Sequence, residues 1–433
     1  MNQWRSSRCI LVLTAVLVLV AAGFYGVFLW AQSEPSRPNV VSQSIVFVSG
    51  TEPMARSEDP KRRERYQQIA SQSEAWWQQI ASRYPDLSPV FRDVPADQNG
   101  FLKWVEFAEK HGCEALKAPA SLAPWFDGGS SFDRFETKRW LLANRTVLDE
   151  LQGIGELSER SIKGLALDRW KQDCGRFELR CADALMLEAR SVAEDGDEAT
   201  ALRRMKAVQG LAAHFSGIEV QDDHHWRIAA TIESRMRDRI LREILPALAG
   251  DRACHLQTWA PLLRAPAASP RDYAAMVRSN WQMSLRQFLL PTLVNLREKG
   301  HAADADKLVE EFTDRMRTQI AACEKAGGFA ELPSWSEIMV PPAQLSAECR
   351  DLFQMAMDDR AAAGREWIAT QIQRSMDEAA FVILSGGPVP TEPLSGKPFA
   401  WNETRRELTL PDSPCLALMK VEVRRVPQLA SIR

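Results

Sequence analysis

Residues 10–31 lie within the longest run of the chain without a charged side chain, and this run restricts the fold more than any other feature. They read ILVLTAVLVLVAAGFYGVFLWA, and a helix of about 20 apolar residues is long enough to cross the core of a bilayer. Arg5 and Arg8 precede the run, whereas Glu34 is the first charged residue after it. Because positive charge is retained on the cytoplasmic side, we expect residues 1–9 in the cytoplasm, a transmembrane anchor at 10–31, and the remainder outside.

A signal peptide cleaved near Ala22 is the main alternative, because small residues gather there. The apolar run nevertheless continues through Leu29, which favours an uncleaved anchor. A pilin-like leader requires an acidic residue where this chain has Phe28, and a lipoprotein requires its cysteine after the apolar run, whereas Cys9 precedes it. The sequence therefore favours the anchor.

Three further regions follow the anchor. Prolines and small polar residues mark residues 32–60 as a linker. Residues 61–385 carry apolar side chains at helical spacing, which predicts an all-α extracytoplasmic domain arranged as an irregular array. Residues 386–433 begin with closely spaced glycines and prolines, which predict a small extended tail. The expected helices cover residues 61–82, 101–110, 133–151, 168–194, 197–215, 226–248, 270–298, 302–325 and 342–384, and the expected extended segments cover 399–401, 408–410 and 418–423.

Two predicted helix pairs share a pattern that is typical of tetratricopeptide-like hairpins. Each has a glycine at the turn, an alanine five residues later and an apolar residue four residues beyond it. The copies are Gly196, Ala201 and Met205, and Gly300, Ala305 and Val309. They are not in tandem, so an ordinary helix hairpin explains the pattern as well.

Several segments together resemble a set of uncharacterised bacterial envelope proteins. These segments are DQNGFLKWVEFAEKHG, the helix pair ADALMLEARSVAEDGDEATALRRMKAVQGLAAHF, DDHHWRIAATIE, EPLSGKPFAW and ETRRELTLP. The resemblance implies an N-terminal anchor in the bacterial inner membrane, a helical periplasmic domain, and a final segment in which Glu392 replaces the usual Asp. It implies no activity.

Charge and cysteine content exclude some classes of function. The net charge is −3, with 54 basic and 57 acidic residues, which disfavours a nucleic-acid partner. The eight cysteines include no CxxC pair, so a zinc knuckle is not indicated. Cys323 and Cys349 flank a glycine- and proline-rich segment and are the preferred disulfide pair in an oxidising compartment, with buried free thiols as the alternative.

One segment partly matches an EF-hand calcium loop. Asp97, Asn99 and Glu106 take the third, fifth and twelfth positions when Gly100 is the sixth, and we treat them as candidate metal ligands. The first position is Pro95, however, which has no side-chain oxygen. A helix capped by Asp97 or Asn99 explains the same residues.

Two other groups of residues have both a functional and a structural explanation. The run Asp222-Asp223-His224-His225 contains possible metal ligands, but its position predicts the start of a helix, where acidic residues are favoured. The chain has 14 Trp and 4 Tyr. The tryptophans that come early in the domain could form a glycan-binding surface, although packing in the core is the favoured explanation: Trp76, Trp77, Trp104 and Trp125.

The motifs of serine hydrolases, zinc proteases and nucleotide-binding loops do not occur in the chain. The sequence therefore favours a scaffold or protein-interaction module without a cofactor, which binds membrane lipid through residues 10–31 and a protein partner through its helical domain. The alternative is an extracytoplasmic hydrolase that acts on an envelope polymer. Its active site would be assembled from carboxylates of this chain that lie far apart in the sequence. That alternative predicts a deep pocket lined by two carboxyls of raised pKa.

Overall fold

A computed structural model describes residues 59–112, 114–127, 129, 133–165, 177–221, 223–264, 269–332, 340–413, 416, 421 and 423–426. None of the helices within these ranges combines the length and the hydropathy that a bilayer-spanning helix requires. The predicted anchor at 10–31 lies outside the described residues, as does the linker up to residue 58.

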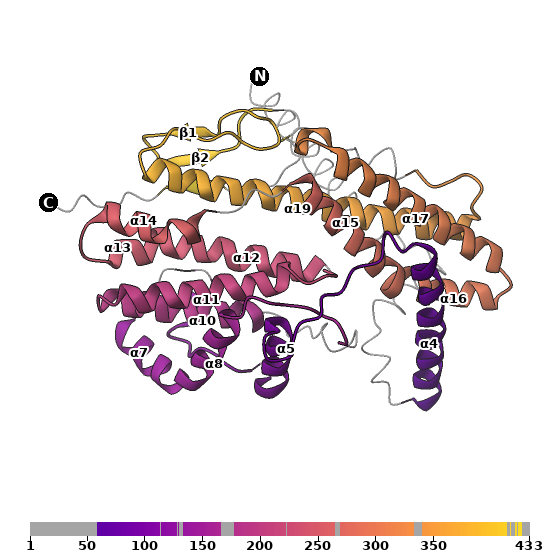
Figure 1. The fold of residues 1–433 in the computed structure, drawn as a ribbon, viewed down its shortest axis with the longest axis horizontal. Coiled ribbons are helices and arrows are strands. Elements are labelled where there is room, and N and C mark those ends of the chain that lie inside the picture. Colours follow the sequence, from indigo (N-terminus) through magenta and orange to yellow (C-terminus); the bar gives the residue numbers. More distant parts are fainter. Residues whose placement is uncertain are drawn as a thin grey trace, which may run out of the picture.

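The predicted all-α class is confirmed, and the helices form two lobes that each surround an apolar core (Figure 1). The first lobe contains α5 (Gly100–His111), α6 (Ala123–Phe126), α7 (Arg134–Ala143), α8 (Arg145–Gly155), α10 (Phe177–Glu194), α11 (Glu198–Ser216), α12 (Asp223–Arg239), α13 (Leu245–Ala247) and α14 (Arg252–Leu263). The second lobe contains α4 (Pro60–Arg83), α15 (Pro270–Ser284), α16 (Leu290–Glu298), α17 (Ala302–Lys325) and the short 3-10 helix η3 (Phe329–Glu331).

The first predicted hairpin forms between α10 and α11. Gly196 has a φ of +84°, a conformation that a residue without Cβ adopts readily. The N–H of Asp197 donates to the carbonyl of Val192 at 3.0 Å, which is the 6→1 bond of a Schellman motif. The Asp197 side chain then accepts the N–H of Thr200 and caps α11. Ala201 is fully buried, which allows the two helices to approach closely.

The second hairpin, between α16 and α17, is closed by the same motif. Gly300 has a φ of +92°, and the N–H of His301 donates to the carbonyl of Leu296 at 3.0 Å. Ala305 is fully buried, like its counterpart in the first hairpin. The common sequence pattern therefore encodes a common turn.

Two predicted helices contain a π-turn that the sequence analysis did not anticipate. In each, the residue before a proline donates to the carbonyl five residues back: Leu245 to Ile240 in η1 (Ile240–Ile244), and Leu290 to Leu285 in η2 (Leu285–Leu289). A proline inside a helix cannot donate a hydrogen bond, and its ring clashes with the carbonyl four residues earlier. The wider π-turn makes room for that ring.

The longest helix, α19 (Ala347–Leu384), joins the two lobes. At 38 residues it is about 57 Å long. Phe353 and Met357, in its first half, belong to the core of the second lobe, whereas Ile372 and Met376 belong to the core of the first. The helix continues without interruption through Gly364.

The preferred Cys323–Cys349 disulfide is wrong. Both residues are buried free thiols in the core of the second lobe, near the end of α17 and the start of α19. Their thiols pack there as small apolar groups. Burial raises the pKa of Cys323 to about 12 and also raises that of Cys349, so both thiols stay protonated and unreactive.

The tail is extended, as predicted, and forms a small antiparallel sheet of β1 (Ala400–Asn402), β2 (Glu407–Thr409) and β3 (Arg424–Arg425) beside α19 (Figure 1). The expected strand at 418–423 lies almost wholly outside the described residues. Arg424 fixes the sheet to the helices through ion pairs with Asp238 at 2.8 Å and Asp377 at 3.1 Å.

The EPLSG segment at the start of the tail is a tight turn. The buried carboxylate of Glu392 accepts the backbone N–H groups of Leu394 and Ser395 at 2.8 and 2.6 Å. Gly396 closes the turn with a φ of +66°. The acidic residue of this segment therefore has a structural role.

Candidate functional site

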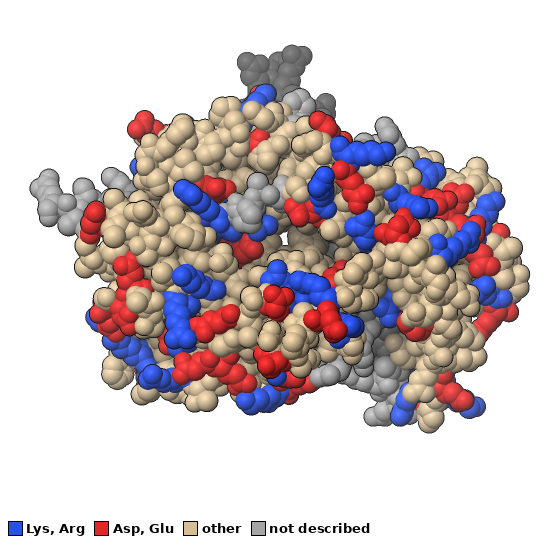
Figure 2. All heavy atoms as spheres, viewed as in Figure 1, with Lys and Arg blue, Asp and Glu red and all other residues tan. Residues whose placement is uncertain are grey.

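A groove of about 750 Å³ lies between the two lobes, within the range of ~300–1,000 Å³ that is usual for ligand pockets. The space-filling view is hollowed between the lobes, near the middle of the face it shows (Figure 2). Three helices and two connecting segments, 85–90 and 216–221, form its walls. Each helix contributes one stripe of residues at helical spacing.

The first stripe belongs to α12 and consists of Trp226, Ala229, Ala230 and Glu233. Trp226 is buried and also belongs to the core of the second lobe, so this end of α12 connects the lobes. The two alanines are small, which leaves space in front of the helix.

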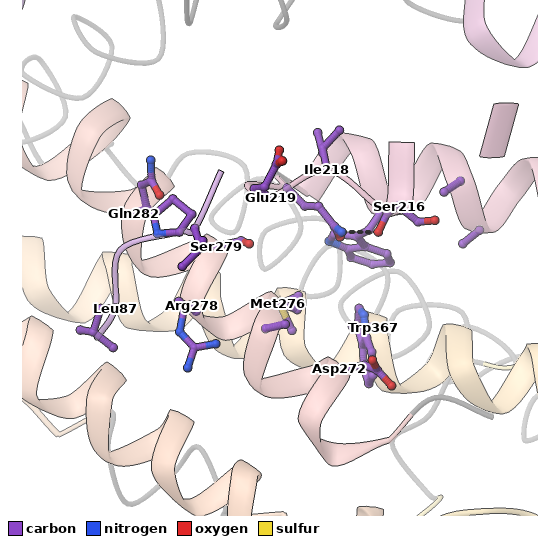
Figure 3. A pocket seen from close by; sticks show the side chains of 18 of the residues that line it. Leu87, Ser216, Ile218, Glu219, Asp272, Met276, Arg278, Ser279, Gln282 and Trp367 are labelled. Atoms are coloured by element: carbon purple, nitrogen blue, oxygen red, sulfur yellow. Dashed lines mark hydrogen bonds between the residues drawn. The ribbon is translucent and has the colours of Figure 1, made fainter. Parts of the chain in front are cut away.

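The second stripe belongs to α15 and consists of Asp272, Met276, Ser279 and Gln282 (Figure 3). Its helix begins with a capping box, in which Asp272 accepts the N–H of Ser269 at 2.7 Å and the Ser269 hydroxyl accepts the N–H of Asp272. This cap fixes where the helix begins and hence which side chains face the groove.

The third stripe belongs to α19 and consists of Trp367, Thr370, Gln371 and Arg374. The Trp367 ring packs against Tyr273 and Phe329, with centroid distances of 5.1 and 6.0 Å. The indole is therefore held in place by aromatic neighbours.

The charged groups of the groove are engaged with other parts of the protein. Glu233 accepts from Arg374 at 2.7 Å and from Arg237 at 3.0 Å. Arg278 pairs with Glu324 at 2.8 Å. Likewise, Asp86 pairs with Arg317 at 2.9 Å. Asp272 has no such ion pair and serves as a helix cap, so most but not all of the charged groups of the groove are neutralised within the protein.

Glu219 holds together the loops that close one side of the groove. Its carboxylate accepts the backbone N–H groups of Arg92 and Ile162, each at 3.0 Å, and the Arg92 side chain at 3.3 Å. Burial alone would raise the pKa of Glu219, but these hydrogen bonds outweigh it and the pKa is lowered. The carboxylate therefore stays ionised, and its hydrogen bonds hold the loops together.

Neutral polar groups of the groove are the ones that remain available. Gln282 is only 3% exposed, and within the described residues its carboxamide makes no hydrogen bond. Ser279, one turn earlier on the same face, is also buried and makes no side-chain hydrogen bond to the described residues. The polar atoms of these two side chains are not enclosed by the protein, so they can be reached from the groove and can form hydrogen bonds with a ligand there.

The carboxyls whose pKa is raised lie outside the groove. Burial raises the pKa of Asp183 to about 7, although Arg235 and Arg239 oppose this effect. Burial also raises the pKa values of Glu188 and Asp377. Asp183 pairs with Arg235 inside the first lobe, so these groups belong to interior ion pairs.

The structure places the three candidate calcium ligands in different roles. Asn99 caps α5 by accepting the N–H of Leu102 at 3.1 Å, and it bonds in both directions with the Ser161 backbone. Asp97 lies exposed in the preceding turn, and Glu106 pairs with Lys103 at 2.8 Å. In the described ranges, no three His, Cys, Asp or Glu side chains are grouped as a metal site would need.

The histidine run is likewise divided between different surroundings. Asp222 lies outside the described residues, and α12 begins at Asp223, as predicted. His225 is buried against the rings of Phe101 and Phe215, with centroid distances of 5.8 and 6.3 Å. His224 points elsewhere and lies 3.6 Å from Glu178.

The early tryptophans are core residues, as the sequence analysis favoured. They are buried and divided between the lobes, with Trp76 and Trp77 in the second core and Trp104 and Trp125 in the first. The indoles that do line the groove, Trp226 and Trp367, were not singled out.

Comparison of the chain with models of protein families, with curated proteins and with solved structures finds no match. The chemistry of the groove therefore carries the functional argument. No motif predicts this site, but the sequence contains one sign of it: Ser279 and Gln282 interrupt the buried face of a helix with polar side chains.

Proposed function

We propose that this protein is a membrane-anchored extracytoplasmic scaffold that holds a segment of a partner protein in the groove between its lobes. The observation that carries the proposal is the construction of the groove. Side-chain stripes from α12, α15 and α19 meet there, and Glu233 and Arg374 of these stripes are paired with each other, while Asp272 caps its own helix.

The apolar run at residues 10–31 supports the membrane location. The predicted linker at residues 32–60 separates the helical domain from the predicted anchor. Each extended residue spans about 3.3–3.6 Å, so this linker is long enough to let the domain reach partners above the membrane.

The edge of the groove supports a protein partner. Val90, which lines the groove, is 89% exposed, and the adjacent Phe91 is 41% exposed. Exposed apolar side chains next to a cavity are typical of interaction sites. The hydrolase alternative gains no such support, because it requires groove carboxyls of raised pKa and those groups lie in the lobe interiors.

Site-specific photo-crosslinking in intact cells tests the proposal. A photoreactive amino acid at Thr370, inside the groove, is expected to yield a discrete adduct with another protein. The same amino acid at Arg139, which is exposed on α7 of the first lobe and does not line the groove, serves as the control. Equal labelling at both positions, or no adduct at Thr370, would contradict the scaffold function.

A fusion of alkaline phosphatase to the C-terminus tests the location separately. The enzyme is expected to be active, because it folds only after export from the cytoplasm, and the product should sediment with membranes. An inactive fusion, or a soluble product that retains its first residues, would remove the anchor from the proposal.

A further inference from the structure

We infer that the groove binds an uncharged, extended peptide segment through its neutral polar side chains, with Gln282 as the main recognition residue. This inference rests on the proposed function and adds the chemical class of the bound segment. A peptide group offers one N–H donor and one carbonyl acceptor, and a glutamine carboxamide offers both complementary groups.

Two buried glutamines show why Gln282 points to a ligand. Gln319, on α17, is 1% exposed, and both of its polar atoms are enclosed without a partner. Gln282 is also almost wholly buried, but it lines the groove and its polar atoms are not enclosed. The carboxamide of Gln282 can therefore be reached from the groove, whereas that of Gln319 cannot.

Further hydrogen-bonding groups lie along the same groove. Ser279 is one helical turn from Gln282, on the wall drawn in Figure 3. On the opposite helix, Gln371 accepts from Arg374 at 3.0 Å, while its own N–H₂ group has no partner among the described residues. Thr370 adds a hydroxyl beside it. A row of neutral donors and acceptors suits the repeating polar groups of a peptide backbone.

The charge pattern selects an uncharged segment. Glu233, Arg278 and Asp86 each have an oppositely charged partner within the protein, so a charged ligand beside them would lose its hydration without gaining a free opposite charge. Asp272 has no such partner, but it is an exposed helix cap that accepts from Ser269. A segment with neutral side chains avoids this loss. An apolar side chain of the segment can contact Val90 at the edge of the groove.

The aromatic residues favour a peptide over a saccharide. Sugar rings bind by stacking on a free aromatic face. Trp367 packs against Tyr273 and Phe329 in tilted contacts, and both Trp367 and Trp226 are buried, at 6% and 5% exposure. Both indoles are therefore already engaged within the protein.

The test uses the full-length chain in lipid nanodiscs and a phage-displayed library of random linear peptides. Selected peptides should contain few charged residues. They should bind the Gln282→Met variant at least about tenfold more weakly than the wild type, as expected for the loss of hydrogen bonds that cannot be replaced. Gln319→Met is the matched control, because it also removes a buried carboxamide, and its binding should be unchanged.

Several results would overturn the inference. These are selection of no peptide, equal binding by the Gln282→Met and wild-type proteins, or Gln282-dependent binding to an array of envelope oligosaccharides. If the Gln282→Met protein does not fold, the Ser279→Ala variant is tested instead. Weaker binding of the selected peptides to this variant would support the inference, and unchanged binding would contradict it. If crosslinking at Thr370 yields an adduct but no peptide is selected, only the inference that the ligand is a peptide is refuted. If crosslinking and peptide selection both fail, the proposed scaffold function is refuted as well.

Discussion

The crossing of α8 and α11 makes a quantitative prediction, because two glycines allow these helices to touch through their backbones. A Cβ added to Gly155 would lie 2.2 Å from the carbonyl oxygen of Ala207, and one added to Gly210 would lie 1.8 Å from the carbonyl oxygen of Gly155. Gly153, two residues earlier on the same helix, is exposed and has no atom within 4 Å of such a Cβ.

We expect Gly155→Ala to destabilise the fold by about 2 kcal/mol. Overpacking a close-packed contact costs about 1–3 kcal/mol, and the upper end applies because a backbone carbonyl cannot rotate away. The higher helix propensity of alanine returns about 1 kcal/mol. The same gain without the clash should stabilise the Gly153→Ala variant by about 1 kcal/mol, so the two variants should differ by about 3 kcal/mol.

Urea denaturation of the full-length chain in detergent, followed by far-ultraviolet circular dichroism, measures this difference. Wild type and both variants should have equal m-values, so that shifts of the midpoint report stability alone. Equal stabilisation by both alanines would refute the close approach of α8 and α11, and equal destabilisation would refute the open surroundings of Gly153.

Three further predictions concern buried groups. Gln319→Leu should stabilise the protein by about 1–3 kcal/mol because it removes two buried polar atoms without partners; in denaturation experiments the exposed Gln67→Leu change should have almost no effect. Asp183 has a folded-state pKa of about 7, above its ordinary 3.8, so its contribution to stability is full below pH 3.8 and is lost as the pH rises through about 7. Asp183→Asn should flatten the dependence of stability on pH in this window, and an unchanged profile would contradict the assignment. In native protein, exposed Cys254 should react with a thiol reagent well before buried Cys323, as mass spectrometry of the alkylated peptides can show.

Local sequence patterns predicted many of the helices but not all of their interruptions. The helix predicted at 302–325 has the same limits in the structure, because Gly300 fixes the preceding turn and an apolar stripe follows it. The helix predicted at 133–151 is instead two helices, which meet at Asn144 without a glycine or proline to mark the break. The helix α14 was missed, because Pro261 lies inside it and its apolar residues follow no clear stripe.

The groove could not be predicted because it depends on contacts between residues far apart in the sequence. Trp226, Gln282 and Gln371 occupy ordinary helical positions, and periodicity alone assigns such positions to a helix–helix contact. Only the packing of the two lobes shows that the faces of α12, α15 and α19 that carry these residues meet around an open groove. Likewise, the loop pattern could not show that Asn99 caps α5 by accepting the N–H of Leu102.

The path of α19 through both cores has a consequence for how the protein melts. If one lobe unfolded alone, the half of α19 that packs in its core would lose those contacts, although the 38-residue helix is continuous. Despite its bilobed outline, the described domain is therefore expected to give a single calorimetric peak, with van't Hoff and calorimetric enthalpies in agreement.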